Sequence, residues 1–164
     1  MKKVSEELRY DGASIEQVHE MLANPAFREQ VCVNQRYVRH TVQIERAGHG
    51  MTVTIDQVQG AKGIPGFARK FVGDAINIVQ SEDWTSPEKG NIHVTIPGKP
   101  GEIVGSETLE QSGDDVVQRI DIAVTVSMPF VGGKVEDLIA GFVGRVFEAE
   151  NTVGVKWLAG EWRV

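Results

Sequence analysis

The spacing of hydrophobic residues changes three times along the chain, and each change predicts a switch between strand and helix. Residues 3–10 alternate between apolar and polar side chains, which is typical of a strand. Ser14 is a favourable helix N-cap, and Gln17 stands three residues later as in a capping box. Asn24 ends this first helix because the following Pro25 disfavours helical backbone at the residue before it. Pro25 can then open a second short helix.

From Tyr37 onward the apolar residues follow the two-residue period of β-strands. Strands are expected at residues 38–44, 51–55, 76–84, 92–96, 102–111 and 116–126. The segments between most of them are short and rich in glycine, proline and aspartate. Short connections favour an antiparallel meander, because parallel strands need a long crossover.

The helical period returns after Met128–Gly133 and continues to about Leu158. One stripe of this long helix is apolar and carries Val135, Leu138, Ile139, Phe142, Val143, Val146, Val153 and Trp157. The helix should be about 39 Å long, enough to cross a whole sheet. The element order is therefore β-α-α, six strands, then α. It predicts an α+β fold, with one domain over residues 1–164 and a curved antiparallel sheet of six to seven strands.

A curved sheet and a long helix do not fit flush against each other. Sheets of six or more strands twist and curl, so a helix laid over the concave face touches the rim better than the centre. The space between them would be lined by apolar side chains from both sides. A concave, mostly apolar space with a few polar groups is the usual form of a small-molecule site.

Composition and charge narrow the possible functions. The chain has 164 residues and a net charge of -6, with 41% hydrophobic and 24% charged residues. An acidic chain without a run of Lys and Arg is unlike a nucleic-acid binder, which has a clustered basic face. No stretch approaches the ~20 apolar residues of a membrane span, and the N-terminus lacks the apolar run of a signal peptide. The single cysteine, Cys32, allows no intramolecular disulfide and favours a reducing compartment, so we expect a cytoplasmic protein.

Several segments resemble the START-like (SRPBCC) superfamily, the helix-grip proteins that include the birch-pollen allergen. The residues that carry the resemblance are Ser14–Asn24 followed by Pro25-Ala26-Phe27-Arg28, Ile64–Gly73, Glu82-Asp83-Trp84 and Met128–Glu136. The later segments resemble an uncharacterised actinobacterial branch. The resemblance implies a helix-grip fold with the C-terminal helix over the concave face. It implies less about function, because members bind lipids, sterols, polyketides or hormones, and some are cyclases or hydrolases.

Polar residues also fall on the strand faces that should point toward the helix. They are Glu6, His40, Gln57, Gln80, Glu82, Glu107 and Gln118, and Glu150 lies within the apolar stripe of the last helix. Each would cost about 2–7 kcal/mol if buried without a partner. They therefore need one another, water or a ligand. Some could orient the polar end of a ligand, and others could form ordinary internal pairs.

The expected cavity lining combines these polar residues with apolar ones. It comprises His40, Val42, Val53, Ile55, Phe67, Phe71, Ile78, Gln80, Trp84, Val94, Glu107, Gln118, Ile120, Ile122, Leu138, Ile139, Phe142, Val146 and Glu150. No cofactor is expected. The four histidines are scattered singly without the spacing of metal ligands, so no metal is expected either.

Residues 60–72 interrupt the strand pattern with bulky apolar side chains between glycines. Ile64, Pro65, Phe67, Phe71 and Val72 could form a movable flap over the cavity or a fixed cap. They could also form a membrane-touching loop aided by neighbouring basic residues, although we expect no stable membrane insertion.

Three functions follow as hypotheses. The first is non-catalytic binding or transport of a hydrophobic small molecule, lipid-like or aromatic. The second is a cyclase- or hydratase-type enzyme that uses His40 with an inward carboxylate. The third is a protein-interaction module that uses the loop 60–72. The sequence does not identify the ligand or the oligomeric state.

Overall fold

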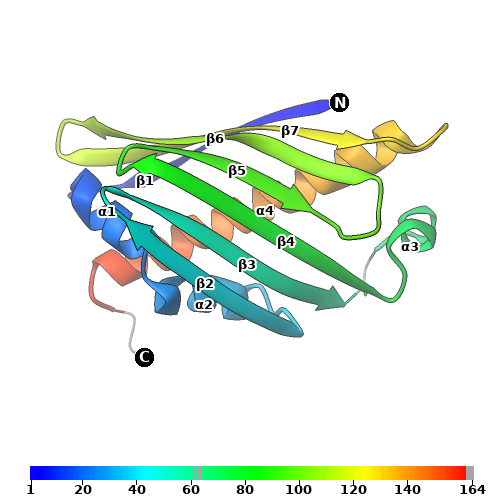
Figure 1. Ribbon diagram of the computed structural model, residues 1–164, viewed down its shortest axis with the longest axis horizontal. Coiled ribbons are helices and arrows are strands. Elements are labelled where there is room, and N and C mark those ends of the chain that lie inside the picture. Colours follow the sequence, from blue (N-terminus) through cyan, green and yellow to red (C-terminus); the bar gives the residue numbers. More distant parts are fainter. Residues whose placement is uncertain (61, 63, 162–164) are drawn as a thin grey trace.

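The computed structural model describes residues 1–60, 62 and 64–161, apart from the side chain of Val72 (Figure 1). Ala61, Gly63 and residues 162–164 lie outside the described part. The elements in chain order are β1 (Lys2–Tyr10), α1 (Ile15–Leu22), α2 (Pro25–Asn34), β2 (Arg39–Ala47), β3 (Gly50–Gly60), α3 (Gly66–Val72), β4 (Ala75–Ser86), β5 (Lys89–Thr95), β6 (Gly101–Ser112), β7 (Asp115–Val126) and α4 (Gly132–Leu158). The predicted order is confirmed, with α3 as an added helix between β3 and β4.

The strands form one seven-stranded sheet in the order β1-β7-β6-β5-β4-β3-β2. All neighbouring strands are antiparallel. Strands β2 to β7 follow one another as the predicted meander, and β1 joins the sheet beside β7. The fold class predicted from the sequence is therefore confirmed.

Local capping explains where the first two helices begin. The Ser14 hydroxyl accepts a hydrogen bond from the Gln17 backbone N–H at 3.2 Å, and Gln17 Oε1 accepts one from the Ser14 N–H at 2.9 Å. This is the predicted capping box. Asn24 caps α2 through its side chain, which accepts from the Ala26 N–H at 3.0 Å, and Pro25 occupies the first turn.

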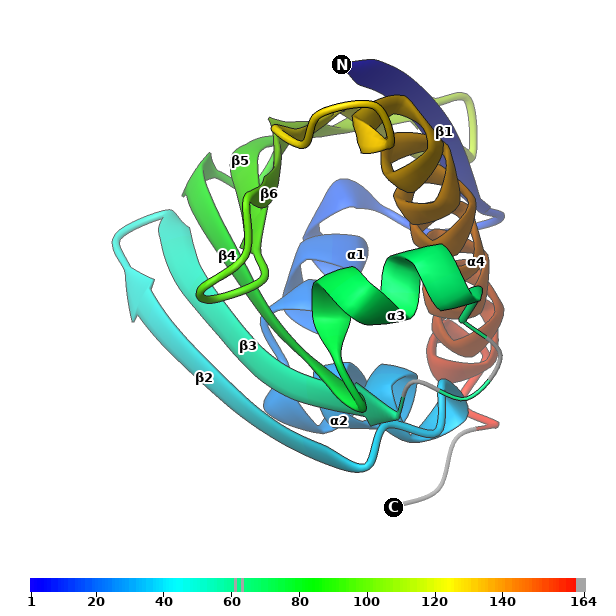
Figure 2. The same ribbon diagram turned by 90° about the vertical axis from the view of Figure 1, so that its right-hand side faces the viewer.

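The long helix α4 faces the inside of the curved sheet but packs closely on only one part of it. Figure 2 shows the sheet curving around the interior, with α4 beside β1, and α1 and α2 at the far end. Gly154 sets the closest approach, because an added Cβ there would lie 2.7 Å from Cε1 of Tyr10 on β1. The helix is thus held against the β1 side of the sheet and stands away from β3, β4 and β5.

The packed interior has two unequal parts. The large one surrounds α1, α2 and the C-terminal half of α4, and includes the fully buried Leu22, Phe27 and Val153. The small one joins Phe71 of α3 to Val126 and Val135. No helix in the described part of the chain has the length and apolar character needed to cross a bilayer.

Candidate functional site

A cavity of about 210 Å³ lies beneath α4, between the two packed regions. Its apolar walls come from α3 and the segment before it, from strands β4 to β7, from the residue that follows β5, and from α4: Ile64, Ala68, Phe71, Ile76, Ile78, Ile92, Val94, Ile96, Ile103, Ile122, Val135, Leu138, Ile139, Phe142, Val143, Val146 and Phe147. The polar side chains that line it are Tyr37, Gln57, Gln59, Lys62, Gln80 and Arg145. An apolar hollow with a few polar groups is the composition of a small-molecule site.

The alternation of the strands brings three glutamines to the cavity, Gln57 and Gln59 of β3 and Gln80 of β4. Gln57 of β3 is opposite Ile78 of β4, and Gln80 of β4 is opposite Ile55 of β3. Side chains two positions apart on one strand share a face, so Gln57, Ile78 and Gln80 all point to the concave side. All three line the cavity.

Helix α3 covers one end of the cavity. Ala68 and Phe71 are buried, with 2% and 6% of their surface exposed, and both line the cavity. Phe71 packs with Val126 of β7 and Val135 of α4, which lie at the entry to the long helix. Figure 2 shows α3 across the open side of the fold, between the sheet and α4. The segment 60–72 thus contributes one short helix whose inner face closes this end.

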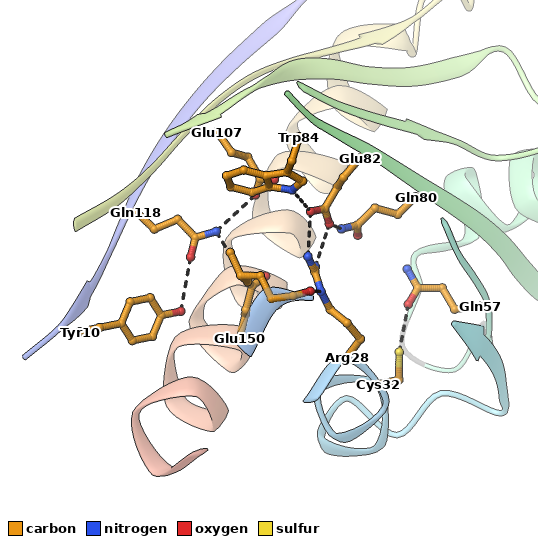
Figure 3. Close-up of polar contacts among 11 residues, drawn as sticks. Tyr10, Arg28, Cys32, Gln57, Gln80, Glu82, Trp84, Glu107, Gln118 and Glu150 are labelled. Atoms are coloured by element: carbon orange, nitrogen blue, oxygen red, sulfur yellow. Dashed lines mark hydrogen bonds and ion pairs between the residues drawn. The ribbon is translucent and has the colours of Figure 1, made fainter. Parts of the chain in front are cut away.

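The opposite end of the interior holds a buried ion pair between Arg28 of α2 and Glu82 of β4 (Figure 3). The guanidinium donates two hydrogen bonds to the carboxylate, at 2.8 and 2.9 Å. Glu82 also accepts from Gln80 Nε2 at 2.6 Å and from Trp84 Nε1 at 2.8 Å. Arg28 Nε donates a further hydrogen bond to the backbone carbonyl of Leu22 at 2.8 Å. Bidentate geometry and full hydrogen bonding are what a buried ion pair requires to be stable.

A second group of polar side chains adjoins this pair. Gln118 Nε2 donates to Glu107 Oε1 at 3.4 Å and to Glu150 Oε1 at 3.3 Å. The Tyr10 hydroxyl donates to Gln118 Oε1 at 3.4 Å. The other oxygen of Glu107, Oε2, is buried and has no hydrogen-bond partner among the described residues. We call the side chains of Tyr10, Arg28, Gln80, Glu82, Trp84, Glu107, Gln118 and Glu150 the polar network.

The polar network contains three buried carboxyl groups and one guanidinium, so the carboxyls differ in protonation. Burial by itself would raise the pKa of Glu82, but the charge of Arg28 and the donated hydrogen bonds outweigh it and hold that pKa below its usual value. Burial, then the charges of Glu82 and Glu150, raises the pKa of Glu107 well above its usual value. Burial raises the pKa of Glu150 to about 7. Glu107 therefore holds its proton to higher pH than an ordinary glutamate does, and Glu150 is partly protonated near neutral pH.

The structure brings part of the predicted lining to the cavity. The residues that line it are Phe71, Ile78, Gln80, Val94, Ile122, Leu138, Ile139, Phe142 and Val146. The others are not part of the cavity wall. Val53, Ile55 and Ile120 belong to the main core, because α1 and α2 fill that end of the concave face. Val42 packs at the edge of the same core, on the outermost strand.

Five predicted lining residues require a specific correction. Trp84, Glu107, Gln118 and Glu150 do face inward, but they bond one another or their neighbours in the polar network instead of facing the cavity. Phe67 is 39% exposed and lies outside the lining, because α3 turns Ala68 and Phe71 inward and Phe67 outward.

His40 is half-buried on the edge strand β2, opposite Gln57, and does not line the cavity. Within the described ranges, no hydrogen bond or ion pair joins it to a carboxylate. The structure therefore does not bring together the acid–base pair that the enzyme hypothesis assigned to this residue.

Arg28 was missed as a buried residue, although the sequence contained a signal for it. It lies three and four positions before Val31 and Cys32, so it shares the buried face of α2 with them. Arginine is seldom buried, so the helical spacing of Arg28 with Val31 and Cys32 was not enough to predict that Arg28 is buried. Tyr37, Gln59 and Arg145 were also missed as lining residues, because their position at the cavity depends on the tertiary packing around it.

Comparisons with known proteins agree with this geometry. Protein TTHA0849 from Thermus thermophilus has a similar structure, with a TM-score of 0.68 and 13% identity over 99% of this chain and 100% of that one. Ara h 8.0201 matches with a TM-score of 0.59 and 8% identity, over 94% and 98% of the two chains. Truncated norcoclaurine synthase from Thalictrum flavum matches with a TM-score of 0.59 and 15% identity, over 93% and 92%. None of the curated proteins matches the sequence.

At such low identities these likenesses establish the fold alone, and that fold is the predicted helix-grip fold. The sequence itself matches one family model, which carries the description "Protein of unknown function (DUF2505)", over residues 5–158. This match spans nearly the whole chain and agrees with the expected uncharacterised branch. The chain therefore belongs to the DUF2505 family and has the START-like helix-grip fold.

Proposed function

We propose that the protein binds a compact hydrophobic small molecule in the cavity beneath α4 and does not transform it. The observation that carries the proposal is the unfilled space in the interior: apolar side chains surround a cavity of about 210 Å³, whereas the regions on either side of it are packed. Structural relatives of the same fold include Ara h 8.0201 and a norcoclaurine synthase, and one fold can serve many functions, so the fold leaves both binding and catalysis open.

The size of the cavity restricts the ligand. An apolar cavity of about 150 Å³ holds benzene, and drug-sized sites are about 300–1,000 Å³. At about 210 Å³ this cavity suits a molecule somewhat larger than one benzene ring. An aromatic or short branched apolar compound is therefore favoured over a long-chain lipid.

Binding without catalysis is favoured by where the ionisable groups lie. Glu82 is paired with Arg28, and Glu107 and Glu150 both accept hydrogen bonds from Gln118. These carboxyl groups therefore bond to other protein side chains. The polar side chains of the cavity wall are Tyr37, Gln57, Gln59, Lys62, Gln80 and Arg145, and among these described lining residues there is no carboxyl group or histidine. Glutamine amides can orient a ligand but do not exchange protons near neutral pH.

An enzyme remains the second candidate because of Glu150. A buried carboxyl with a pKa of about 7 is suited to general acid–base chemistry. This role requires the ligand to reach past the cavity wall into the polar network. The interaction-module hypothesis is less well supported, since Ala68 and Phe71 of the segment 60–72 face inward.

The proposal can be tested by filling the cavity. Native mass spectrometry of the protein from its own host, and thermal shifts with a library of small aromatic and branched apolar compounds, should reveal ligands of the wild type. In Val146→Trp the indole should occupy the cavity and abolish the shifts. The matched control is Val155→Trp, at a half-exposed position on the same helix. A wild type that retains no ligand and shows no shift, or shifts that persist in Val146→Trp, would contradict the proposal.

A further inference from the structure

We propose that Gln57 and Gln80 form a donor–acceptor pair that selects a neutral ligand bearing a hydroxyl group. This inference rests on the proposed function and names the class of ligand for the same cavity. Both glutamines line the cavity and come from adjacent strands, β3 and β4. The polar contacts that they make with the protein leave one amide group of each side chain available to a ligand.

The orientation of the Gln80 amide is set by the ion pair behind it. Gln80 Nε2 donates to Glu82 Oε2 at 2.6 Å. The reversed amide would place its oxygen against a carboxylate, which offers no hydrogen, so this orientation is the only one that bonds. Glu82 stays ionised through its pairing with Arg28. In the described part of the chain no donor bonds Gln80 Oε1, so this oxygen is left as a hydrogen-bond acceptor for a ligand in the cavity that Gln80 lines.

The Gln57 amide has the opposite polarity. Its oxygen faces the thiol of Cys32, with a sulfur–oxygen distance of 3.7 Å. Burial raises the pKa of Cys32 to about 11, so the thiol keeps its proton and can donate it weakly. Among the described residues, Gln57 bonds the protein through this oxygen alone, and its Nε2 group is left with two N–H donors. Figure 3 shows that nitrogen pointing away from Cys32.

The register of the sheet places the two free groups within reach of one ligand atom. Gln57 is opposite Ile78, and Gln80 is two residues further along the same strand. Such diagonal neighbours on one face of an antiparallel pair lie about 7–8 Å apart, and glutamine side chains span that gap from both sides. A hydroxyl can accept from Gln57 Nε2 and donate to Gln80 Oε1 at the same time.

A carboxylate does not fit between the same two groups. It has no hydrogen for Gln80 Oε1, and the negative charge of Glu82 lies directly behind that amide. Lys62 and Arg145, both exposed residues of the cavity lining, could hold an anion elsewhere. The affinity of an anionic ligand should therefore not depend on the two glutamines.

The experiment compares three probes of similar size: 4-ethylphenol, ethylbenzene and 4-methylbenzoate. Dissociation constants are measured by calorimetry for the wild type, Gln57→Leu and Gln80→Leu. The matched control is Gln43→Leu, at an exposed position on β2. Circular dichroism verifies that each variant folds. If Gln80→Leu fails to fold because Glu82 loses a donor, Gln57→Leu decides the question alone.

We expect 4-ethylphenol to bind the wild type and Gln43→Leu about tenfold more tightly than ethylbenzene, as one or two hydrogen bonds allow. In Gln57→Leu and Gln80→Leu this preference should fall to less than about twofold, while ethylbenzene binding remains. A preference that survives both substitutions, no preference in the wild type, or a glutamine-dependent affinity for 4-methylbenzoate would overturn the inference. If neither these probes nor the compounds of the apolar library bind the wild type, the proposed function fails as well, whereas a missing hydroxyl preference removes only this inference.

Discussion

The two ends of the interior beneath α4 differ in polarity and in packing. At the end covered by α1 and α2, charged and polar side chains are buried, and each needs a partner in a fixed place. At the end covered by α3, the walls are apolar and about 210 Å³ is left unfilled. An apolar surface tolerates an empty space, whereas a buried charge does not tolerate a missing partner. The comparison shows that buried polar side chains do not by themselves mark a ligand-binding site, and that unfilled space is the better indicator of one.

Breaking the buried ion pair should have the largest effect. Arg28→Met leaves the Glu82 carboxylate buried without its cation, which typically costs about 3–5 kcal/mol of unfolding free energy. The matched control is Arg46→Met, which removes an exposed ion pair with Glu20 and should cost less than about 1 kcal/mol. Urea denaturation measures both. Equal losses of unfolding free energy in the two variants would mean that the buried Glu82 carboxylate does not depend on its partner Arg28.

The second-largest effect is expected when a side chain is enlarged at each of the two ends, because the loss of unfolding free energy should differ between them. Val116→Phe adds volume where no surface is exposed, and overpacking should destabilise the protein by about 1–3 kcal/mol or more. Val94→Phe adds the same volume beside the cavity, where there is room, so its effect on unfolding free energy should be below about 1 kcal/mol. Thermal and urea unfolding provide the comparison. A Val94→Phe variant as unstable as Val116→Phe would show that the space is not available.

A smaller effect should appear as a pH dependence at the polar end. The pKa of Glu150 is about 7 in the folded protein against an ordinary value of 4.5, so folding favours its protonated form. Between these values the folded chain holds a proton that the unfolded chain has released. Wild-type stability from this group is therefore present below pH 4.5, declines as the pH rises through that window and stays low above about 7.

Glu150→Gln removes this titration but keeps an oxygen that can accept from Gln118. Relative to the wild type, the variant should gain about 2–2.5 kcal/mol between pH 5 and pH 8, or several degrees in Tm. Tm values measured at pH 5, 6, 7 and 8 give the trend. Glu20→Gln, at an exposed carboxyl, is the control and should show no such gain. A constant difference across the pH range for Glu150→Gln would contradict the assignment.

The periodicity of the sequence was sufficient for the elements of the fold. The capping box at Ser14, the proline at the start of α2 and the strand alternation each depend on residues close together in the chain. Strand alternation also pointed Gln57, Glu82, Glu107 and Gln118 inward, as the structure has them. It could not distinguish a side chain that lines a cavity from one that bonds a neighbour, because both face the same side of the sheet.

What the sequence determined by itself was the set of inward-facing residues and the order of helices and strands, since these follow from local period and capping. The tertiary structure decided which of those residues meet. Arg28 reaches Glu82 only because α2 docks against the concave face of the sheet, and the two residues are 54 positions apart. The cavity likewise depends on the contact of Gly154 with Tyr10, which holds α4 against β1 and away from the central strands. Packing between distant segments sets such distances, and no local pattern records them.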